Sequence, residues 1–127
     1  MRWSSRIEGA AWEYGADYDY LEELCRYWKE DYDWRKWEGR LKVYPHFFSN
    51  IDGVDIHFWH ILGKGRHPFP VLLLHGWPGS AFEFFDTIEL LTDPGSHGGN
   101  PKDALDVIIP DLPDFGWSGK PCVPGGR

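Results

Sequence analysis

Apolar positions in the first third of the chain recur every three or four residues, which is typical of amphipathic helices. One stripe follows Asp17 and Asp19, either of which can cap a helix, and a shorter stripe follows Asp33. Residues 1–16 show no such period and are expected to be irregular. We interpret both stripes as packing faces, made of Tyr20, Leu21, Leu24, Tyr27 and Trp28 in the first helix and of Trp34, Trp37 and Leu41 in the second.

After residue 45 the pattern changes to that of strands. Residues 46–51 and 54–62 predict two antiparallel strands, because the turn dipeptide Asp52-Gly53 separates them. Residues 70–75 form an uninterrupted apolar run. Such a run predicts a strand buried on both faces in a parallel sheet.

A helix and a further strand are predicted downstream of that run. Ser80 and Glu83 have the spacing of a capping box, so a helix is expected from Ala81 to Leu91. A second apolar strand follows at residues 105–110, and the tail over residues 111–127 is too rich in Pro and Gly for regular structure. The strand, helix and strand predict a parallel βαβ unit.

These elements define the fold class as α/β, with two parts. Residues 1–45 are expected to form a helical N-terminal meander. Residues 46–127 are expected to hold an antiparallel hairpin joined to the parallel βαβ unit, which is the beginning of an open α/β sheet.

Composition and charge exclude several classes of protein. Apolar residues make up 42% of the chain and aromatic residues 17%, which excludes a disordered protein. The net charge of −7 argues against a nucleic-acid partner, since no basic patch neutralises phosphates. Cys25 and Cys122 have no metal or redox spacing and are expected to be reduced thiols. No apolar run approaches a membrane span, so we expect a cytoplasmic protein.

The stretch with chemical content is His75-Gly76-Trp77-Pro78-Gly79-Ser80, placed between a strand and a helix. It resembles the loop after the third strand of α/β hydrolases, which supplies a backbone N–H to an oxyanion hole. Pro78 restricts Trp77 to an extended conformation, and Gly76 and Gly79 allow the backbone to pass close to a substrate. The Trp77 N–H is the candidate donor, with His75, Gly76, Pro78 and Gly79 as its frame.

Three other kinds of candidate, for a nucleophile, a metal site and a catalytic base, do not fit their pattern. A nucleophile elbow has the pattern Gly-x-Ser-x-Gly, but the glycine after Ser118 comes one residue too early, and prolines follow. Ser118 is therefore interpreted as a turn residue. His57 and His60 lie on opposite faces of a strand and cannot share a metal. His75 ends a strand and is interpreted as a hydrogen-bonded framework residue. We expect neither a metal nor an organic cofactor.

The same hexapeptide resembles the corresponding motif of epoxide hydrolases of the microsomal and juvenile-hormone type and their microbial relatives. The resemblance extends to the stretch that begins at Trp12, to the hairpin around Asp52-Gly53 and to the loop over residues 110–118. In that loop the family usually has Ser in place of Asp111 and Gly-Tyr in place of Asp114-Phe115.

The resemblance implies hydrolysis of a small-molecule epoxide to a diol. It implies an Asp nucleophile that forms an ester, two lid tyrosines that polarise the epoxide, and a His with an acidic partner that activates water. It places all of these downstream of residue 127, so the isolated chain is expected to be inactive. The resemblance therefore assigns only one part of the active site to these 127 residues, the Trp77 donor and its frame. Trp77 and Phe115 are expected to line the substrate pocket.

Two alternatives remain open. The chain is either part of such an enzyme or a non-catalytic fragment that serves as an association module. In the second case the strand from Val71 to Leu74 would lack the neighbour that it has in the family and would expose an apolar edge for self-association. A haloalkane dehalogenase is a weaker alternative, because those enzymes share the Gly-x-Pro turn. The resemblance also implies a further helical segment upstream of Met1.

Overall fold

The chain divides into two units, Met1–Arg40 and Leu41–Arg127, which are described separately. The computed structural model describes residue 5 and residues 7–122. The boundary lies five residues before the one expected from the sequence, because Leu41 and Tyr44 already pack against the core of the second unit.

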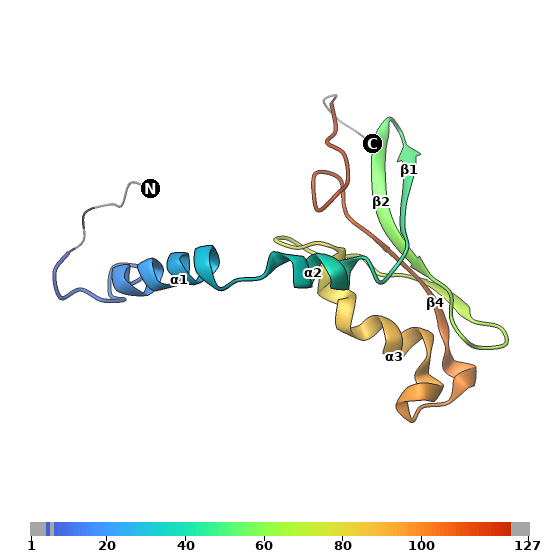
Figure 1. Ribbon diagram of the computed structural model, residues 1–127. Helices are drawn as coiled ribbons and strands as arrows, with labels where there is room; N and C mark the ends of the chain where they lie inside the picture. Colours follow the sequence, from blue (N-terminus) through green and yellow to red (C-terminus); the bar gives the residue numbers. More distant parts are fainter. Residues whose placement is uncertain (1–4, 6, 123–127) are drawn as a thin grey trace. The chain divides into compact units, whose positions relative to one another are not determined.

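The first unit contains helix α1 (Tyr18–Glu30) and most of helix α2 (Trp34–Leu41), as the periodicity predicts (Figure 1). The side chain of Asp17 caps α1 by accepting a hydrogen bond of 2.9 Å from the Tyr20 N–H. The carboxylate of Asp33 accepts one of the same length from the Arg35 N–H at the start of α2. Short polar residues thus start both helices, as expected from the unpaired N–H groups of a first turn.

The apolar stripes of these helices are only partly covered, so their interpretation as packing faces holds for some positions and not for others. Leu21, Leu24 and Trp37 are half-buried, as is Leu41, which packs against the core of the second unit. Neither helix has a buried residue, and the Tyr20 and Trp28 side chains are 49% and 59% exposed. The ring of Tyr20 meets only a local partner in the described residues, Trp12, at 5.2 Å between centroids. Periodicity identifies an amphipathic helix but cannot show what covers it. Among the described residues, no helix is long and apolar enough to cross a membrane.

The second unit begins with the predicted hairpin of β1 (His46–Ile51) and β2 (Val54–Ile61). The strands pair from His46 opposite Trp59 to Ile51 opposite Val54. Asp52 and Gly53 both have positive φ angles, +50° and +83°. These are the angles of the two-residue turn that matches the twist of a hairpin, so the turn dipeptide sets the register.

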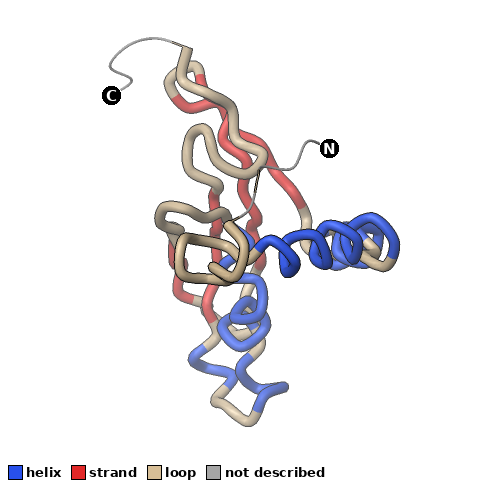
Figure 2. The backbone as a smooth tube through the Cα atoms, turned by 90° about the vertical axis from the view of Figure 1, so that its left-hand side faces the viewer, coloured by secondary structure: helices blue, strands red, loops and turns tan. Residues whose placement is uncertain are grey.

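The sheet is completed by β3 (Phe69–Leu72) and β4 (Leu105–Pro110), and its strand order is β1-β2-β4-β3. Figure 2 draws the strands in red. β3 and β4 are parallel, which confirms the βαβ unit, and β4 is antiparallel to β2. The last strand therefore lies between the hairpin and β3. As a result, the loop that follows β4 lies near both the hairpin and the loop that follows β3.

The prediction that the third strand is buried on both faces is wrong. In β3 the side chains of Phe69 and Leu72 are 71% and 57% exposed, and the nearby Leu74 is 55% exposed. β3 is the edge strand of the sheet, with β4 as its one hydrogen-bonded neighbour in the described chain. An apolar run records a tendency to be buried, but the neighbours decide whether burial occurs.

The helix expected from Ala81 to Leu91 is present in two parts. Its first half is a 3₁₀-helix, η1 (Ala81–Thr87), and its second half is α3 (Ile88–Thr92). Ser80 caps the start as predicted, because its hydroxyl accepts from the Phe82 N–H at 3.3 Å. The Glu83 N–H bonds to the Ser80 carbonyl, which is the tight spacing of a 3₁₀ turn and is common at helix starts. Two further 3₁₀ turns, η2 (Pro94–His97) and η3 (Pro101–Asp103), lead to β4.

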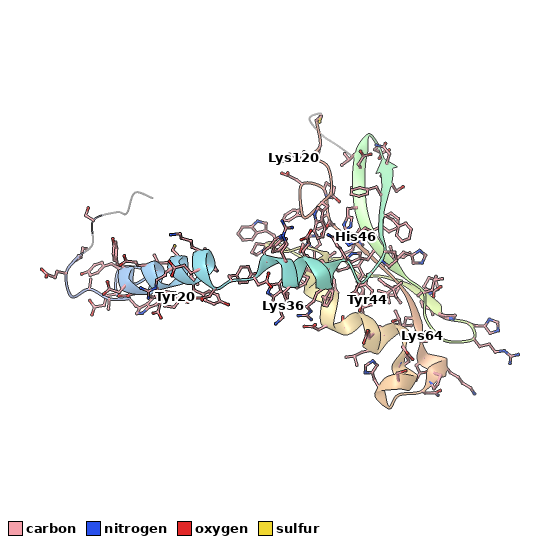
Figure 3. The ribbon with its side chains drawn as sticks, viewed as in Figure 1. Tyr20, Lys36, Tyr44, His46, Lys64 and Lys120 are labelled. Carbon is pink, nitrogen blue, oxygen red and sulfur yellow. The ribbon has the colours of Figure 1, made fainter. Side chains whose placement is uncertain are left out.

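The core lies between one face of the sheet and the η1–α3 segment. Trp59 is fully buried at its centre, and its ring contacts those of Tyr44 and Phe85 at centroid distances of 6.0 and 6.1 Å. Tyr44 and His46 lie where the chain enters β1 (Figure 3). The other fully buried members of this core are Ala81, Ile88, Val107 and Ile109.

Candidate functional site

The loop over residues 75–80 lies between β3 and η1, as the sequence predicts, but β3 ends at Leu72 and not at His75. His75 is buried at its start. The Nε2 atom of His75 accepts a hydrogen bond of 3.0 Å from the Leu112 N–H, and Nδ1 lies 3.0 Å from the Gly76 carbonyl oxygen. A backbone N–H can only donate and a carbonyl can only accept, so the proton of a neutral imidazole is on Nδ1. Both ring nitrogens are occupied, which agrees with the framework role.

Trp77 occupies the middle of this loop. Its side chain is 85% exposed, and its peptide bond with Pro78 is cis. Within the described residues, the Trp77 N–H donates to no acceptor, whereas the Ala81 N–H at the end of the loop is bonded. The Trp77 amide therefore keeps its hydrogen-bonding capacity for an external acceptor. Its assignment as an oxyanion donor stays a prediction.

Gly79 is the glycine of this loop that the packing requires. A Cβ atom at this position would lie 1.6 Å from a carboxylate oxygen of Glu83 and 2.8 Å from the Gly76 carbonyl oxygen. At Gly76 a Cβ atom would meet no described atom within 4 Å. The chain therefore folds tightly at the helix end of the loop and has room at its strand end.

The structural centre of the site is Asp111, which sequence reasoning noted only as a departure from the family pattern. Asp111 is fully buried directly after β4. One of its carboxylate oxygens, Oδ1, accepts a hydrogen bond of 2.8 Å from the Ala81 N–H. The other, Oδ2, accepts from the Trp117 N–H at 3.1 Å and lies 2.8 Å from Nδ1 of His57. The sequence contains one indication of this role, because Asp111 directly follows an apolar strand. A carboxylate that is buried there needs hydrogen-bond donors inside the protein.

The loop after β4 is shaped around this carboxylate. Gly116 has a φ angle of +50°, and a Cβ atom there would lie 2.2 Å from the carboxylate of Asp111. Ser118 donates from its hydroxyl to the Asp111 carbonyl at 2.7 Å and accepts from the His57 N–H at 2.9 Å. The Ser118 hydroxyl thus joins the loop to β2, which agrees with its interpretation as a turn residue rather than a nucleophile.

Burial by itself raises the pKa of Asp111, because it removes water from the charged form. Hydrogen bonds from His57, Ala81 and Trp117 act in the opposite direction and leave the pKa below its ordinary value. The carboxylate is therefore held in its charged form.

This lowered pKa predicts a loss of stability in acid. The contribution of Asp111 is complete above the unfolded-state pKa of about 4 and is lost as the pH falls through the lower pKa of the folded state. We expect the free energy of unfolding, measured in urea, to fall below about pH 4. The difference between the native protein and an Asp111→Asn variant should shrink over the same range. A constant difference from pH 6 to pH 2.5 would contradict the prediction.

A chain of imidazoles continues from Asp111 to β1. His57 is fully buried, and its Nε2 lies 2.8 Å from Nδ1 of His46. Because the carboxylate needs a donor from His57 Nδ1, a neutral His57 must accept at Nε2, and His46 must donate from Nδ1. Nε2 of His46 then accepts from the indole N–H of Trp59 at 3.3 Å. The carbonyl oxygen of Leu41 also lies 3.0 Å from Nε2 of His46, but it can accept a hydrogen bond only if Nε2 carries a proton. The contacts of Nε2 with Trp59 and with Leu41 are therefore alternatives: the first needs a bare Nε2 and the second a protonated one.

His57 and His60 point to opposite faces of β2, as the strand period predicts. The ring of His57 lies on the helix-covered face with His46 and Trp59. The ring of His60 lies near Phe47, 6.5 Å away between centroids.

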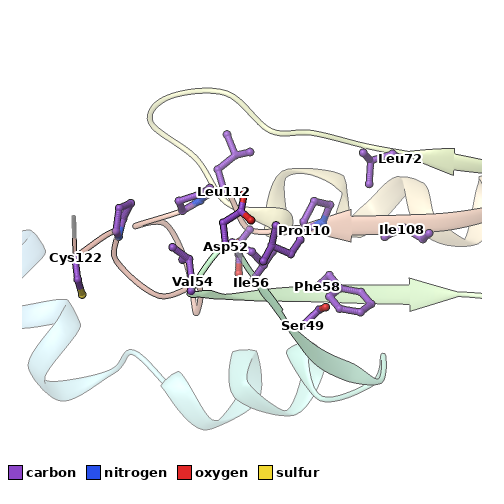
Figure 4. A pocket seen from close by; sticks show the side chains of 15 residues that line it. Ser49, Asp52, Val54, Ile56, Phe58, Leu72, Ile108, Pro110, Leu112 and Cys122 are labelled. Carbon is purple, nitrogen blue, oxygen red and sulfur yellow. The ribbon is translucent and has the colours of Figure 1, made fainter. Parts of the chain in front are cut away.

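The other face of the sheet borders a cavity of about 740 Å³ (Figure 4). Its walls are mostly apolar and come from the hairpin, from the ends of β3 and β4 and from the segment after β4. The lining residues include Ile56, Phe58, Leu72, Pro110 and Leu112. Trp77 and Phe115, which were expected to line a common pocket, are not among the described residues that border it. The ring of Phe115 lies against His75, 5.4 Å away between centroids.

Comparison with known proteins agrees with this geometry. Residues 1–84 match the family described as "Epoxide hydrolase N terminus". Epoxide hydrolase 1 of Oryctolagus cuniculus is 43% identical over 122 residues, which cover 93% of this chain and 27% of that protein. The chain thus spans about a quarter of the length of this relative.

Solved structures of epoxide hydrolases have the same fold. The juvenile hormone epoxide hydrolase of the silkworm Bombyx mori is 38% identical and has a TM-score of 0.81, over 98% of this chain and 30% of that one. The Aspergillus niger epoxide hydrolase is 29% identical with a TM-score of 0.74, over 94% of this chain and 32% of that one. The hairpin, the βαβ unit and the loop over residues 75–80 are therefore those of the N-terminal part of an α/β hydrolase, and the chain belongs to the epoxide hydrolase family.

Proposed function

We propose that this chain provides the oxyanion-hole segment of an enzyme that hydrolyses small-molecule epoxides to vicinal diols. The observation that supports the proposal is the Trp77 amide, which has no acceptor among the described residues and stands in a loop bonded at both ends. A donor that is fixed before charge develops needs no reorganisation in the transition state.

The proposed chemistry has two steps. An Asp carboxylate attacks an epoxide carbon, the C–O bond of the ring breaks, and the released oxygen takes a proton from a lid tyrosine. Water activated by a His then attacks the ester carbonyl, whose oxygen becomes negative and accepts a hydrogen bond from the Trp77 N–H. Collapse of this intermediate breaks the ester C–O bond, and the diol oxygen that leaves takes the proton that the His removed from water. The second water proton returns to the tyrosine, which leaves the Asp as a carboxylate. We propose that the nucleophile, the tyrosines and the His come from chain beyond these 127 residues.

The test is a chimera in which residues 1–127 replace the matching part of the silkworm enzyme. Trp77 is exchanged for indole-3-lactic acid, which keeps the side chain and puts an ester oxygen in place of the N–H. We expect the kcat for diol formation from styrene oxide to fall about 10²–10³-fold, the loss that follows removal of one oxyanion donor.

Two controls accompany this experiment. A Trp77→Phe chimera keeps the N–H and should retain kcat within a few fold, and the isolated 127-residue chain should form no diol. If the ester and the Phe variant are equally active, the Trp77 N–H is not an oxyanion donor. An inactive chimera with native Trp77, if correctly folded, would contradict the proposed activity itself.

A second candidate function, association through the edge of the sheet, is favoured by the exposure of β3. Leu72 is 57% exposed on a strand that pairs on one side in the described chain. An unpaired apolar edge is a template for another strand, and a charged side chain on the edge prevents such pairing.

We expect the isolated chain to sediment as a concentration-dependent mixture and Leu72→Lys to shift it to monomer. Leu90→Lys is the matched control, since Leu90 is 51% exposed but lies on α3. Sedimentation velocity over a range of concentrations separates the two. A monomeric native chain, or an equal effect of both substitutions, would contradict association through β3.

A further inference from the structure

Two consecutive residues after β4 hold the two ends of the candidate oxyanion loop. At the strand end, the Leu112 N–H donates to His75 Nε2 at 3.0 Å. At the helix end, the Ala81 N–H donates to Asp111 Oδ1 at 2.8 Å. The five residues between these anchors include Trp77, whose amide has no partner among the described residues.

The carboxylate that holds Ala81 is itself fixed. Rotation of the Asp111 side chain is opposed at Oδ2 by the Trp117 N–H and by Nδ1 of His57. His57 is held in turn by His46, and both Asp111 and His57 are fully buried. The position of Oδ1 is therefore determined by β1, β2 and the loop after β4, not by the oxyanion loop alone.

We infer that Asp111 is a positioning residue for the Trp77 N–H. It acts through the Ala81 N–H, with His75 as the second anchor, and transmits the geometry of the buried His46–His57–Asp111 chain to the loop. The inference rests on the proposed function, because a positioned amide matters to catalysis only if it meets an oxyanion. An error of about 1 Å in such a group can cost about 10²-fold in rate.

The experiment uses ¹⁵N relaxation and amide hydrogen exchange in the 127-residue chain that carries Leu72→Lys, the substitution expected to keep it monomeric. Asp111→Ala removes the acceptor of Ala81. We expect the Ala81 amide to lose its protection and the order parameter of the Trp77 amide to fall from about 0.85 to below about 0.6. Asp106→Ala is the matched control: the carboxylate of Asp106 on β4 accepts from the Gly63 N–H at 2.7 Å, in a loop remote in sequence from Trp77. This control should leave the Trp77 order parameter unchanged.

Asp111→Asn keeps the measurement possible if the alanine variant does not fold. An amide has one carbonyl oxygen, so either Ala81 or Trp117 loses its acceptor, and hydrogen exchange identifies which one. We expect Trp77 to become mobile only when Ala81 is released. A rigid Trp77 amide beside a released Ala81 would overturn the inference, and so would a mobile Trp77 beside a protected Ala81.

The failure of this inference can be told from failure of the proposed function. The relaxation experiment measures only the mobility of the Trp77 amide, whereas the kcat of the ester chimera measures the contribution of the Trp77 N–H to catalysis. In the chimera, the Asp111→Asn substitution should lower kcat about 10-fold or more, with KM little changed, if hydrogen exchange shows that it releases Ala81. Loss of kcat on removing the Trp77 N–H, together with full activity of Asp111 variants that release Ala81, would refute the positioning role alone.

Discussion

Replacing Trp59 with alanine is expected to lower the free energy of unfolding of the second unit by about 3–5 kcal/mol, the usual cost of deleting a buried aromatic side chain. Trp59 is fully buried, and its ring contacts Tyr44 and Phe85. The substitution leaves a cavity between the sheet and the η1–α3 segment that these neighbours fill only partly. Because domains of this size are stable by about 5–15 kcal/mol, a large part of the unit's stability would be lost.

Urea titration followed by the amide resonances of Val107 and Ile109 measures this effect in the second unit alone. Trp77→Ala is the matched control, because that side chain is 85% exposed. It should change stability by less than about 0.5 kcal/mol. An equal cost for the two substitutions would show that the Trp59 ring is not at the centre of the core.

Asp111→Ala is expected to cost a similar amount, about 3–5 kcal/mol, through lost hydrogen bonds instead of lost packing. The substitution removes the acceptor of the Ala81 and Trp117 N–H groups and the partner of His57 Nδ1. A buried donor left without an acceptor costs about 1–3 kcal/mol. The imidazole can move its proton to the other nitrogen, but the two backbone N–H groups have no such alternative.

Lys120→Ala is the control in the same loop, since the Lys120 side chain is 81% exposed and its Nζ lies 3.2 Å from the Asp114 carboxylate. An exposed pair of this kind contributes about 0–1 kcal/mol. The same urea titration compares the two variants. If Asp111→Ala costs no more than Lys120→Ala, the carboxylate of Asp111 does not join the three segments that it contacts.

Local pattern was sufficient for the elements that depend on neighbouring residues. The turn dipeptide Asp52-Gly53 sets a hairpin register because its positive φ angles are available to few residues. Ser80 caps a helix start because its hydroxyl reaches an N–H two residues away. The motif that begins at His75 identified the epoxide hydrolase family for the same reason, since its residue types and spacing are contiguous in the chain.

The sequence by itself therefore determined the hairpin, the parallel βαβ unit, the helix caps and the position of the candidate oxyanion loop. Only the tertiary structure decided that β4 lies between β2 and β3, that β3 is exposed, and that Asp111 joins His57 to Ala81. The physical reason is range. Caps and turns are set by bonds between residues a few positions apart, whereas Asp111 reaches partners 30 and 54 residues away. Burial of the apolar run likewise depends on which strands and helices come to lie beside it.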